Sequence, residues 1–155
     1  MERTIFTLSI EPTGMEYRAI LDACIRHCSA GLLVERPSLG MSEQGKLVIE
    51  KIRPWIREEK HCSEWPGTKL YGHTALVRVF AFDRDSARVL QDSADSLYQW
   101  QQPALPEDLC LLRPDGDPWL VSISHERDAY MKISEDERNY LARSVPELTA
   151  TLRYS

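Results

Sequence analysis

Hydrophobic residues alternate with polar ones at the start of the chain and then change to a helical spacing. In residues 4–10 every second side chain is apolar, which is typical of a half-buried strand. Residues 14–29 repeat apolar side chains every three or four positions. Thr13 and Glu16 have the spacing of a capping box, so a helix is predicted there. Gly31 ends this helix, and residues 31–35 are expected to form a short strand that returns either parallel or antiparallel to the first.

The middle of the chain is expected to contain a second helix, a loop and the most apolar strand. Ser42 is a suitable N-cap for the helix, and Pro54 must kink or end it. Residues 60–72 contain a proline and two glycines and show no period, so they are predicted to be an ordered loop. Residues 73–82 are apolar on both faces, which predicts a strand in the middle of a covered sheet.

The last part of the chain shows one more helix, a hairpin and a capped terminal helix. A third helix is expected from Asp83 or Asp85 to about Gln99. Residues 109–113 and 119–124 flank a turn rich in proline, glycine and aspartate, which predicts a β-hairpin. Residues 129–133 add a short strand. Ser134 and Glu137 then form a capping box for a final helix that ends near Ser144.

This order of elements predicts the α+β fold class. We expect a single globular domain, residues 1–155, built on one mixed β-sheet of about five to six strands with about four helices packed on it. The sequence shows no internal repeat, no low-complexity tract and no linker that would divide the chain.

The charge balance narrows the class of partner. The chain has 24 acidic and 19 basic residues and a net charge of -5, which disfavours a nucleic-acid ligand because phosphates require clustered Lys and Arg. The acidic excess is concentrated in residues 101–155, so a basic partner is expected to dock there. No apolar stretch approaches the ~20 residues of a membrane span, and no signal peptide opens the chain. We therefore expect a soluble, cytoplasmic protein that does not bind membranes.

Cysteine and histidine residues are the potential metal ligands, but their spacing does not favour a metal site. Structural zinc sites use closely spaced ligand pairs on loops, whereas Cys24 and Cys28 share the buried face of a predicted helix. We expect no metal and no cofactor, with the cysteines reduced and packed as small apolar residues. Among these potential ligands, the adjacent pair His61 and Cys62 is the one that packing in a core explains least. The ligands considered are Cys24, His27, Cys28, His61, Cys62, Cys110 and His125.

The segment from Ser122 to Asp128 is the strongest candidate for catalysis. His125 beside Glu126 and Asp128 could have a pKa suited to acid–base chemistry. Adjacent residues of a strand point to opposite faces, so Ser124 and His125 cannot form a nucleophile–base pair directly. His125 continues the apolar row of the predicted strand, and a histidine at the rim of the core is the preferred interpretation.

Residues 40–46 have the glycine spacing of a phosphate-binding loop. Leu47 stands where a Ser or Thr must hold magnesium, and no buried strand leads into the segment. A loop that enters a helix is therefore the expected structure. No dinucleotide fingerprint, zinc-protease motif or nucleophile elbow occurs in the sequence.

The residues expected to bind a partner are one aromatic side chain and four acidic ones. Trp65 is either a lid on the core, which is the preferred interpretation, or an anchor in an interface. Carboxylates around the predicted hairpin would steer a basic protein if they converged on one surface. The predicted binding residues are Trp65, Glu107, Asp108, Asp115 and Asp117.

The sequence favours a non-enzymatic, acidic protein-binding domain, for which an immunity-type antagonist of a basic toxin domain is the example. The alternative is a small hydrolase or transferase centred on His125, with Glu126, Asp128 or His73 as its polar partners. A homodimeric scaffold is the third hypothesis, with Trp65 or the final helix buried across a two-fold axis.

Overall fold

The computed structural model describes residues 2–155, and its centre is an eight-stranded antiparallel sheet. The strands are arranged in the order β10-β1-β9-β8-β7-β2-β6-β3. A separate two-stranded hairpin is formed by β4 (Glu64–Trp65) and β5 (Thr68–Lys69). The strands of the large sheet are β1 (Thr4–Leu8), β2 (Ala30–Glu35), β3 (Ile56–Cys62), β6 (Ala75–Ala81), β7 (Glu107–Leu112), β8 (Pro118–Ile123), β9 (Asp128–Ile133) and β10 (Leu152–Tyr154).

The α+β class is confirmed, but the sheet is larger than predicted and not mixed. Every neighbouring pair in it runs antiparallel. The sequence allows the first two strands to pair either parallel or antiparallel, but in the structure they do not pair at all: β9, β8 and β7 lie between β1 and β2. The helix between them therefore connects distant strands of one sheet.

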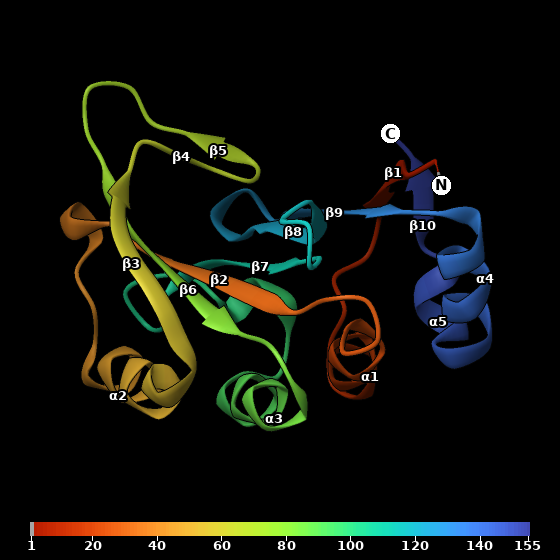
Figure 1. The fold of residues 1–155 in the computed structure, drawn as a ribbon, viewed down its shortest axis with the longest axis horizontal. Helices are drawn as coiled ribbons and strands as arrows, with labels where there is room; N and C mark the ends of the chain where they lie inside the picture. Colours follow the sequence, from red (N-terminus) through yellow and green to blue (C-terminus); the bar gives the residue numbers. More distant parts are fainter. Residues whose placement is uncertain (1) are drawn as a thin grey trace.

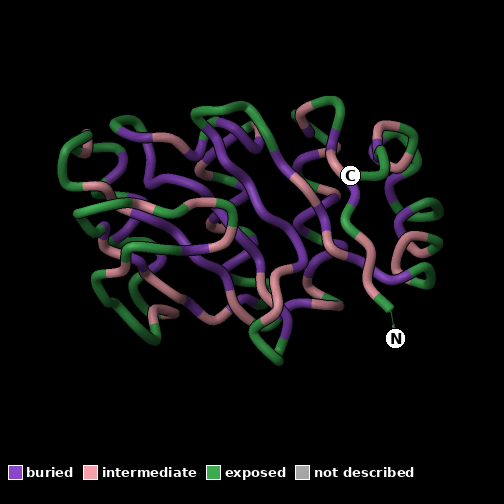
Figure 2. Tube along the Cα trace, turned by 90° about the horizontal axis from the view of Figure 1, so that it is seen from above, coloured by how far each residue is buried: buried purple, intermediate pink, exposed green. Residues whose placement is uncertain are grey.

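Helices cover one face of the sheet and the small hairpin covers part of the other. Figure 1 shows α1, α2 and α3 below the sheet, the β4–β5 hairpin above it, and α4 and α5 beside the edge formed by β1 and β10. In the view from above, buried chain runs through the middle and exposed chain lies at the turns (Figure 2). The helices are α1 (Met15–Cys24), α2 (Glu43–Ile52), α3 (Arg84–Ser93), α4 (Glu135–Ser144) and α5 (Pro146–Thr149).

The larger core lies between the sheet and the helices. Its fully buried aromatic side chains include Tyr17, Phe80 and Trp100. The polar atoms of Tyr17 and Trp100 are paired, since Nε1 of Trp100 donates to the Tyr17 hydroxyl at 2.9 Å and that hydroxyl donates to the Leu90 carbonyl at 2.7 Å. Gly31 is required here because a Cβ on it would overlap the ring of Phe80, which crosses β2.

Most of the helix starts follow the capping residues in the sequence. Ser42 caps α2 by accepting from Gly45 N at 3.1 Å, and Asp83 caps α3. The capping box of Ser134 and Glu137 at the start of α4 is confirmed. The box predicted at Thr13 is wrong: Gly14 is the N-cap of α1 and makes no side-chain bond, and the helix is shorter than predicted, ending at Cys24.

The prediction of a loop over residues 60–72 is wrong. The first residues belong to β3, and the following ones form the β4–β5 hairpin. Strand β3 is an edge strand that pairs with β6 alone and is polar on both faces, so it has no apolar alternation to reveal it. No local pattern predicted α5, which begins at Pro146, or β10, which pairs with β1 at the edge of the sheet.

A smaller core lies on the opposite face of the sheet, under the β4–β5 hairpin. The side chain of Trp65 packs there on apolar residues of four neighbouring strands and is 5% exposed. The residues under this hairpin are Leu32, Val34, Ala75, Val77, Cys110 and Val121. Strand β6 is therefore covered on both faces, as predicted. Among residues 2–155, no helix combines the length and the apolar character that crossing a bilayer requires.

Candidate functional site

Polar side chains from four parts of the chain meet beside the β4–β5 hairpin. Glu107 and Asp108 are the first residues of β7, and His125 lies in a short 3-10 helix, Ser124–Glu126, directly after β8. Trp65 comes from β4, and Arg36 follows β2. Ligand-type atoms of Glu107, Asp108 and His125 all lie within 4.8 Å of one another. We call these five residues the polar cluster.

Asp108 is the centre of the polar cluster and is completely buried. Its Oδ2 accepts a hydrogen bond from Nε1 of Trp65 at 3.2 Å, and its Oδ1 accepts one from the backbone N of Ser124 at 3.0 Å. The Nη2 of Arg36 lies 4.0 Å from Oδ2. Two N–H donors and a nearby guanidinium are what a buried carboxylate needs, because an unpaired one would be very costly.

A β-bulge turns Asp108 into this position. Along β2 and β7, Leu32 pairs with Cys110 and Val34 pairs with Glu107, so β7 contains one residue more than its partner. Asp108 adopts the left-handed conformation with φ 56, which is uncommon for a residue other than glycine and is best tolerated by Asn and Asp. The bulge therefore allows two acidic neighbours in one strand to be buried together.

Trp65 is a lid on the smaller core, in agreement with the preferred interpretation from the sequence. The guanidinium of Arg36 lies 5.4 Å from the centre of the indole ring, so Trp65 is held by a cation on its face and a carboxylate at its N–H. The hairpin turn also rests on the sheet. A Cβ on Gly67 would lie 2.9 Å from carbon atoms of Val121 and Ile123, and φ at this glycine is +88.

Glu107 is also completely buried and bonds to a different set of partners. Its Oε1 accepts from the backbone N of Gln102 at 2.7 Å, and its Oε2 lies 3.4 Å from Nδ1 of His125. Burial raises the pKa of Glu107 above its ordinary value, and the Asp108 charge raises it further, against the effect of the Gln102 N–H. Gln102 also ties the cluster to Arg36, whose backbone N donates to Gln102 Oε1 at 2.6 Å.

His125 is placed differently from the prediction. Strand β8 ends at Ile123, so His125 does not continue the apolar row of the strand; its side chain is 37% exposed in the 3-10 helix. Its carboxylate neighbour among the described residues is Glu107 and not Glu126 or Asp128. A histidine beside a buried carboxylate has the geometry to transfer protons.

The other proposed members of a catalytic centre do not converge on His125. Glu126 and Asp128 are exposed, and Oδ1 of Asp128 accepts from Ala129 N at 2.9 Å. His73 lies in the exposed connection before β6, where its Nδ1 lies 3.1 Å from the Tyr71 carbonyl oxygen. The side chain of Ser124 is buried and has no hydrogen-bond partner among the described residues, so its hydroxyl is shielded from solvent.

The four acidic residues predicted to bind a partner do not form one exposed acidic surface. Glu107 and Asp108 are buried. Asp117 accepts from Arg3 at 2.7 Å and from Lys132 at 3.0 Å, and Asp115 lies 3.2 Å from the same Arg3. The sequence could not show this because Arg3 is more than a hundred residues away from both aspartates. Their charge is neutralised within the chain.

The cysteines and histidines considered as metal ligands are dispersed. Cys24, Cys28 and Cys110 are buried free thiols, and burial raises the pKa of Cys110 to about 12. Within residues 2–155 the group with ligand geometry for an ion is Glu107, Asp108 and His125. Both oxygens of Asp108 and Oε1 of Glu107 already accept N–H bonds, so Oε2 of Glu107 and the His125 ring are the members of this group that accept no backbone or indole N–H.

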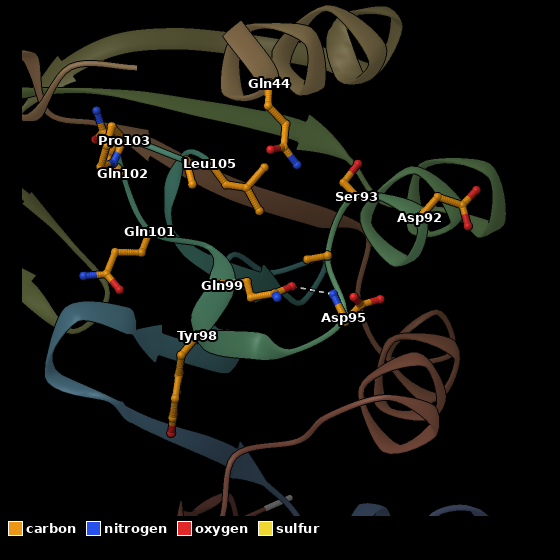
Figure 3. Close-up of a pocket in the computed structure, with 12 residues that line it drawn as sticks. Gln44, Asp92, Ser93, Asp95, Tyr98, Gln99, Gln101, Gln102, Pro103 and Leu105 are labelled. Carbon is orange, nitrogen blue, oxygen red and sulfur yellow. Dashed lines mark hydrogen bonds between the residues drawn. The ribbon is translucent and has the colours of Figure 1, made fainter. Parts of the chain in front are cut away.

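A polar groove of about 600 Å³ shares one residue, Gln102, with the surroundings of the cluster. Its walls are formed by the start of α2, the end of α3 and the segment before β7 (Figure 3). Gln99 is held in place there because its Oε1 accepts from Asp95 N at 2.6 Å. The lining is rich in amide and acidic groups, which include Gln44, Asp92, Asp95, Gln99, Gln101 and Gln102.

The segment that resembles a phosphate-binding loop is a helix entry, as predicted. Ser42 caps α2, and Nζ of Lys46 lies 3.5 Å from a carboxylate oxygen of Glu43 one turn earlier. The glycine at position 45 is inside the helix, where a Cβ would overlap the side chain of Met41. The lysine is therefore paired on the helix surface.

Comparison with family models, with curated proteins and with solved structures finds no match to this chain. The residues of the polar cluster are therefore identified by the geometry of the structure alone. Sequence reasoning missed Arg36, Gln102 and the backbone of Ser124, because none of them belongs to a local motif. It singled out Trp65, Glu107, Asp108 and His125, and the structure brings these four together.

Proposed function

We propose that this protein is a non-enzymatic binding domain whose partner is another protein. The observation that carries the proposal is the anchoring of the β4–β5 hairpin by the Trp65–Asp108 hydrogen bond. The anchored hairpin leads directly into an exposed loop, and Tyr71 in that loop is 79% exposed. A recognition loop on a rigid support binds with a smaller loss of conformational entropy than a free loop.

The exposed side chains next to the hairpin have the composition of an interface. We define the loop edge as residues 36–39 and 69–74, which flank an open hollow of about 360 Å³. Tyr71 and Leu39 are exposed beside it, and tyrosine is among the residues that most often dominate binding energy. The two segments contain no acidic residue, and Lys69 is an exposed cation there, so they favour a neutral or acidic patch on the partner.

The location and charge of this surface differ from the expectation based on composition. A basic partner was expected at the acidic C-terminal part, but Asp115 and Asp117 are already paired with Arg3 and Lys132. We therefore keep the hypothesis of a protein-binding domain, for which an immunity-type antagonist remains the example, and propose that its partner contacts the loop edge.

Chemical cross-linking in cells that express the chain tests this proposal. Tyr71→Ser is expected to abolish the cross-link to a specific partner, because this variant removes the exposed aromatic ring and leaves the Trp65 anchor unchanged. Met15→Ser is the matched control, since Met15 is 87% exposed on α1 and lies outside the loop edge. The same partner retained by the Tyr71→Ser variant would contradict the proposed surface, and the absence of any specific partner would contradict the function.

The contact between His125 and Glu107 supports a second candidate function, acid–base catalysis in a small hydrolase or transferase. The two side chains lie 3.4 Å apart, and His125 is open to solvent on its other side. Hydrolysis of simple carboxylic and phosphate esters by the wild type and by His125→Gln is the test. Activity that is lost in a folded His125→Gln variant would favour the enzyme over the binding domain, whereas equal rates would exclude this histidine from the chemistry.

A further inference from the structure

A groove on the helical side of the molecule is lined by four arginines. It lies between α1 and α3, which are adjacent in Figure 1, and has a volume of about 620 Å³. The two helices are fastened to each other there, because Arg18 donates to the Gln91 carbonyl at 3.1 Å and Gln91 Nε2 donates to the Arg18 carbonyl at 2.8 Å. The lining residues are Arg18, Asp22, Ile25, Arg26, Arg84, Arg88, Gln91 and Tyr140. We call this the arginine groove.

Three of the four arginines in the arginine groove form no ion pair among residues 2–155. Arg18 is the exception, because its Nη2 donates to Oδ1 of Asp92 at 3.4 Å. Arg26, Arg84 and Arg88 form no ion pair among residues 2–155, whereas arginines elsewhere, such as Arg78, pair with carboxylates at 2.8 and 2.9 Å. The chain as a whole has 24 acidic and 19 basic residues, so a groove lined by arginines without an ion pair differs from the acidic balance of the chain.

The single acidic residue of the groove does not neutralise these charges. Oδ1 of Asp22 accepts from Gln91 Nε2 at 2.8 Å, so its nearest partner is an amide. Arg26 is held by an aromatic contact instead, with its guanidinium 4.8 Å from the centre of the Tyr140 ring. The three guanidinium groups without an ion pair line the same groove, so an anion bound there would be attracted by all of them.

Side chains, not the helix end, would hold the anion. Although Arg84 is the first residue of α3, the amides of Asp85 and Ser86 already donate to the capping Asp83. Guanidinium groups suit this task because each presents a rigid fork of donors that matches two oxygens of a phosphate. Arg84 and Arg88 are one turn apart on α3, so both can face one ligand.

We propose that the arginine groove binds a small phosphate-bearing ligand with several negative charges, such as a polyphosphate or a phosphate ester. The volume lies within the usual range for small-molecule sites, roughly 300–1,000 Å³. Three unpaired cations match a multiply charged phosphate better than a single carboxylate. This site is on the helical face and is independent of the loop edge.

Thermal unfolding and calorimetry with sodium tripolyphosphate test the proposal, at an ionic strength kept constant with sodium chloride. The wild type is expected to bind tripolyphosphate and to unfold at a higher temperature in its presence. Arg84→Gln with Arg88→Gln should weaken the binding by at least about tenfold, because two charge-assisted contacts are lost. Both positions are exposed, so circular dichroism should show a native fold in the double variant.

Arg57→Gln is the matched control. Arg57 is an exposed arginine of β3 that donates to the Pro54 carbonyl at 3.2 Å and forms no ion pair among the described residues. This variant and Tyr71→Ser should both bind tripolyphosphate like the wild type, which separates the arginine groove from the proposed protein-binding surface.

Equal binding by the Arg84→Gln, Arg88→Gln variant, or no binding by the wild type at millimolar tripolyphosphate, would overturn the proposal. Binding of a poly-glutamate peptide in place of tripolyphosphate would overturn it in favour of an acidic protein segment.

Discussion

Nε1 of Trp65 donates a hydrogen bond to Oδ2 of Asp108 at 3.2 Å, between residues 43 positions apart in the sequence. Both side chains are buried, the indole at 5% exposure and the carboxylate at 0%. This bond joins the hairpin to the sheet at the bulge in β7, and the other Asp108 oxygen joins the same point to the turn after β8. The exposed loop edge therefore depends on a contact that lies beneath it.

Removal of the indole N–H should cost more stability than removal of the same group elsewhere. Trp65→Phe keeps an aromatic ring but leaves Oδ2 of Asp108 without its donor, so the free energy of unfolding should fall by about 1–3 kcal/mol. Trp55→Phe is the control, because Trp55 is half-buried and makes no side-chain hydrogen bond among the described residues. Urea denaturation measures both. Equal losses in the two variants would show that the Asp108 bond contributes nothing beyond packing.

The buried Glu107 should make the protein less stable as the pH rises from weakly acidic values. Burial raises the pKa of Glu107 above its ordinary 4.5, so the folded state retains a proton that the unfolded state has already lost. Between the unfolded and the folded pKa, the folded chain binds more protons, and the contribution of Glu107 to stability decreases with increasing pH.

Glu107→Gln tests this dependence because the amide oxygen can still accept from Gln102 N. The urea midpoint of the wild type should fall as the pH rises above about 4.5, and that of the variant should not. The variant should therefore be more stable than the wild type at neutral pH. Glu126→Gln, at an exposed position, should follow the wild type. If the difference in the free energy of unfolding between the wild type and Glu107→Gln does not change with pH, Glu107 is ionised to the same extent in the folded and the unfolded state.

Glu137 should have the opposite dependence on pH. Burial alone would raise its pKa, but hydrogen bonds from Arg113 at 2.6 and 2.7 Å and from Ser134 N outweigh burial and lower the pKa to about 2. A carboxyl group with a lowered folded pKa contributes stability above its unfolded pKa of about 4.5, and this contribution is lost as the pH falls toward 2.

Glu137→Gln should therefore destabilise the protein at pH 7 by about 2–3 kcal/mol, since charged hydrogen bonds to Arg113 are lost. The difference from the wild type should shrink in acid. Glu135→Gln is the control, because Glu135 lies in the same first turn of α4 but is exposed. Urea midpoints between pH 2 and pH 7 give the comparison. A loss at pH 7 that persists unchanged at pH 2 would mean that packing, not charge, is responsible.

Gly67 should tolerate a side chain less well than Gly72, although both have φ near +80. Gly67→Ala adds a clash with Val121 and Ile123 to the cost of the left-handed conformation, whereas Gly72 has open space around it. We expect Gly67→Ala to lose at least about 1 kcal/mol more than Gly72→Ala and to expose Trp65 to solvent. Tryptophan fluorescence and urea denaturation measure this. If the two variants behave alike, the hairpin turn does not rest on β8.

Local sequence signals were sufficient for the elements that carry an apolar face or a cap. Strands β1 and β6 and helices α2 and α4 were predicted because alternation, helical spacing and the caps Ser42 and Ser134 are properties of a few neighbouring residues. The same signals failed at β3, since an edge strand needs no buried face, and at Thr13, where a glycine caps the helix without a side chain.

The sequence by itself also selected Trp65, Glu107, Asp108 and His125, but it assigned the two carboxylates to an exposed surface and His125 to a strand. Only the tertiary structure placed the two carboxylates inside, because their partners are Gln102 N, Ser124 N, Trp65 and Arg36, which come from separate parts of the chain. It likewise paired Asp117 with Arg3, and it collected unpaired arginines from α3 and from the turn after α1 into one groove. Whether a charge is buried, paired or free depends on contacts between distant segments, and no local pattern contains that information.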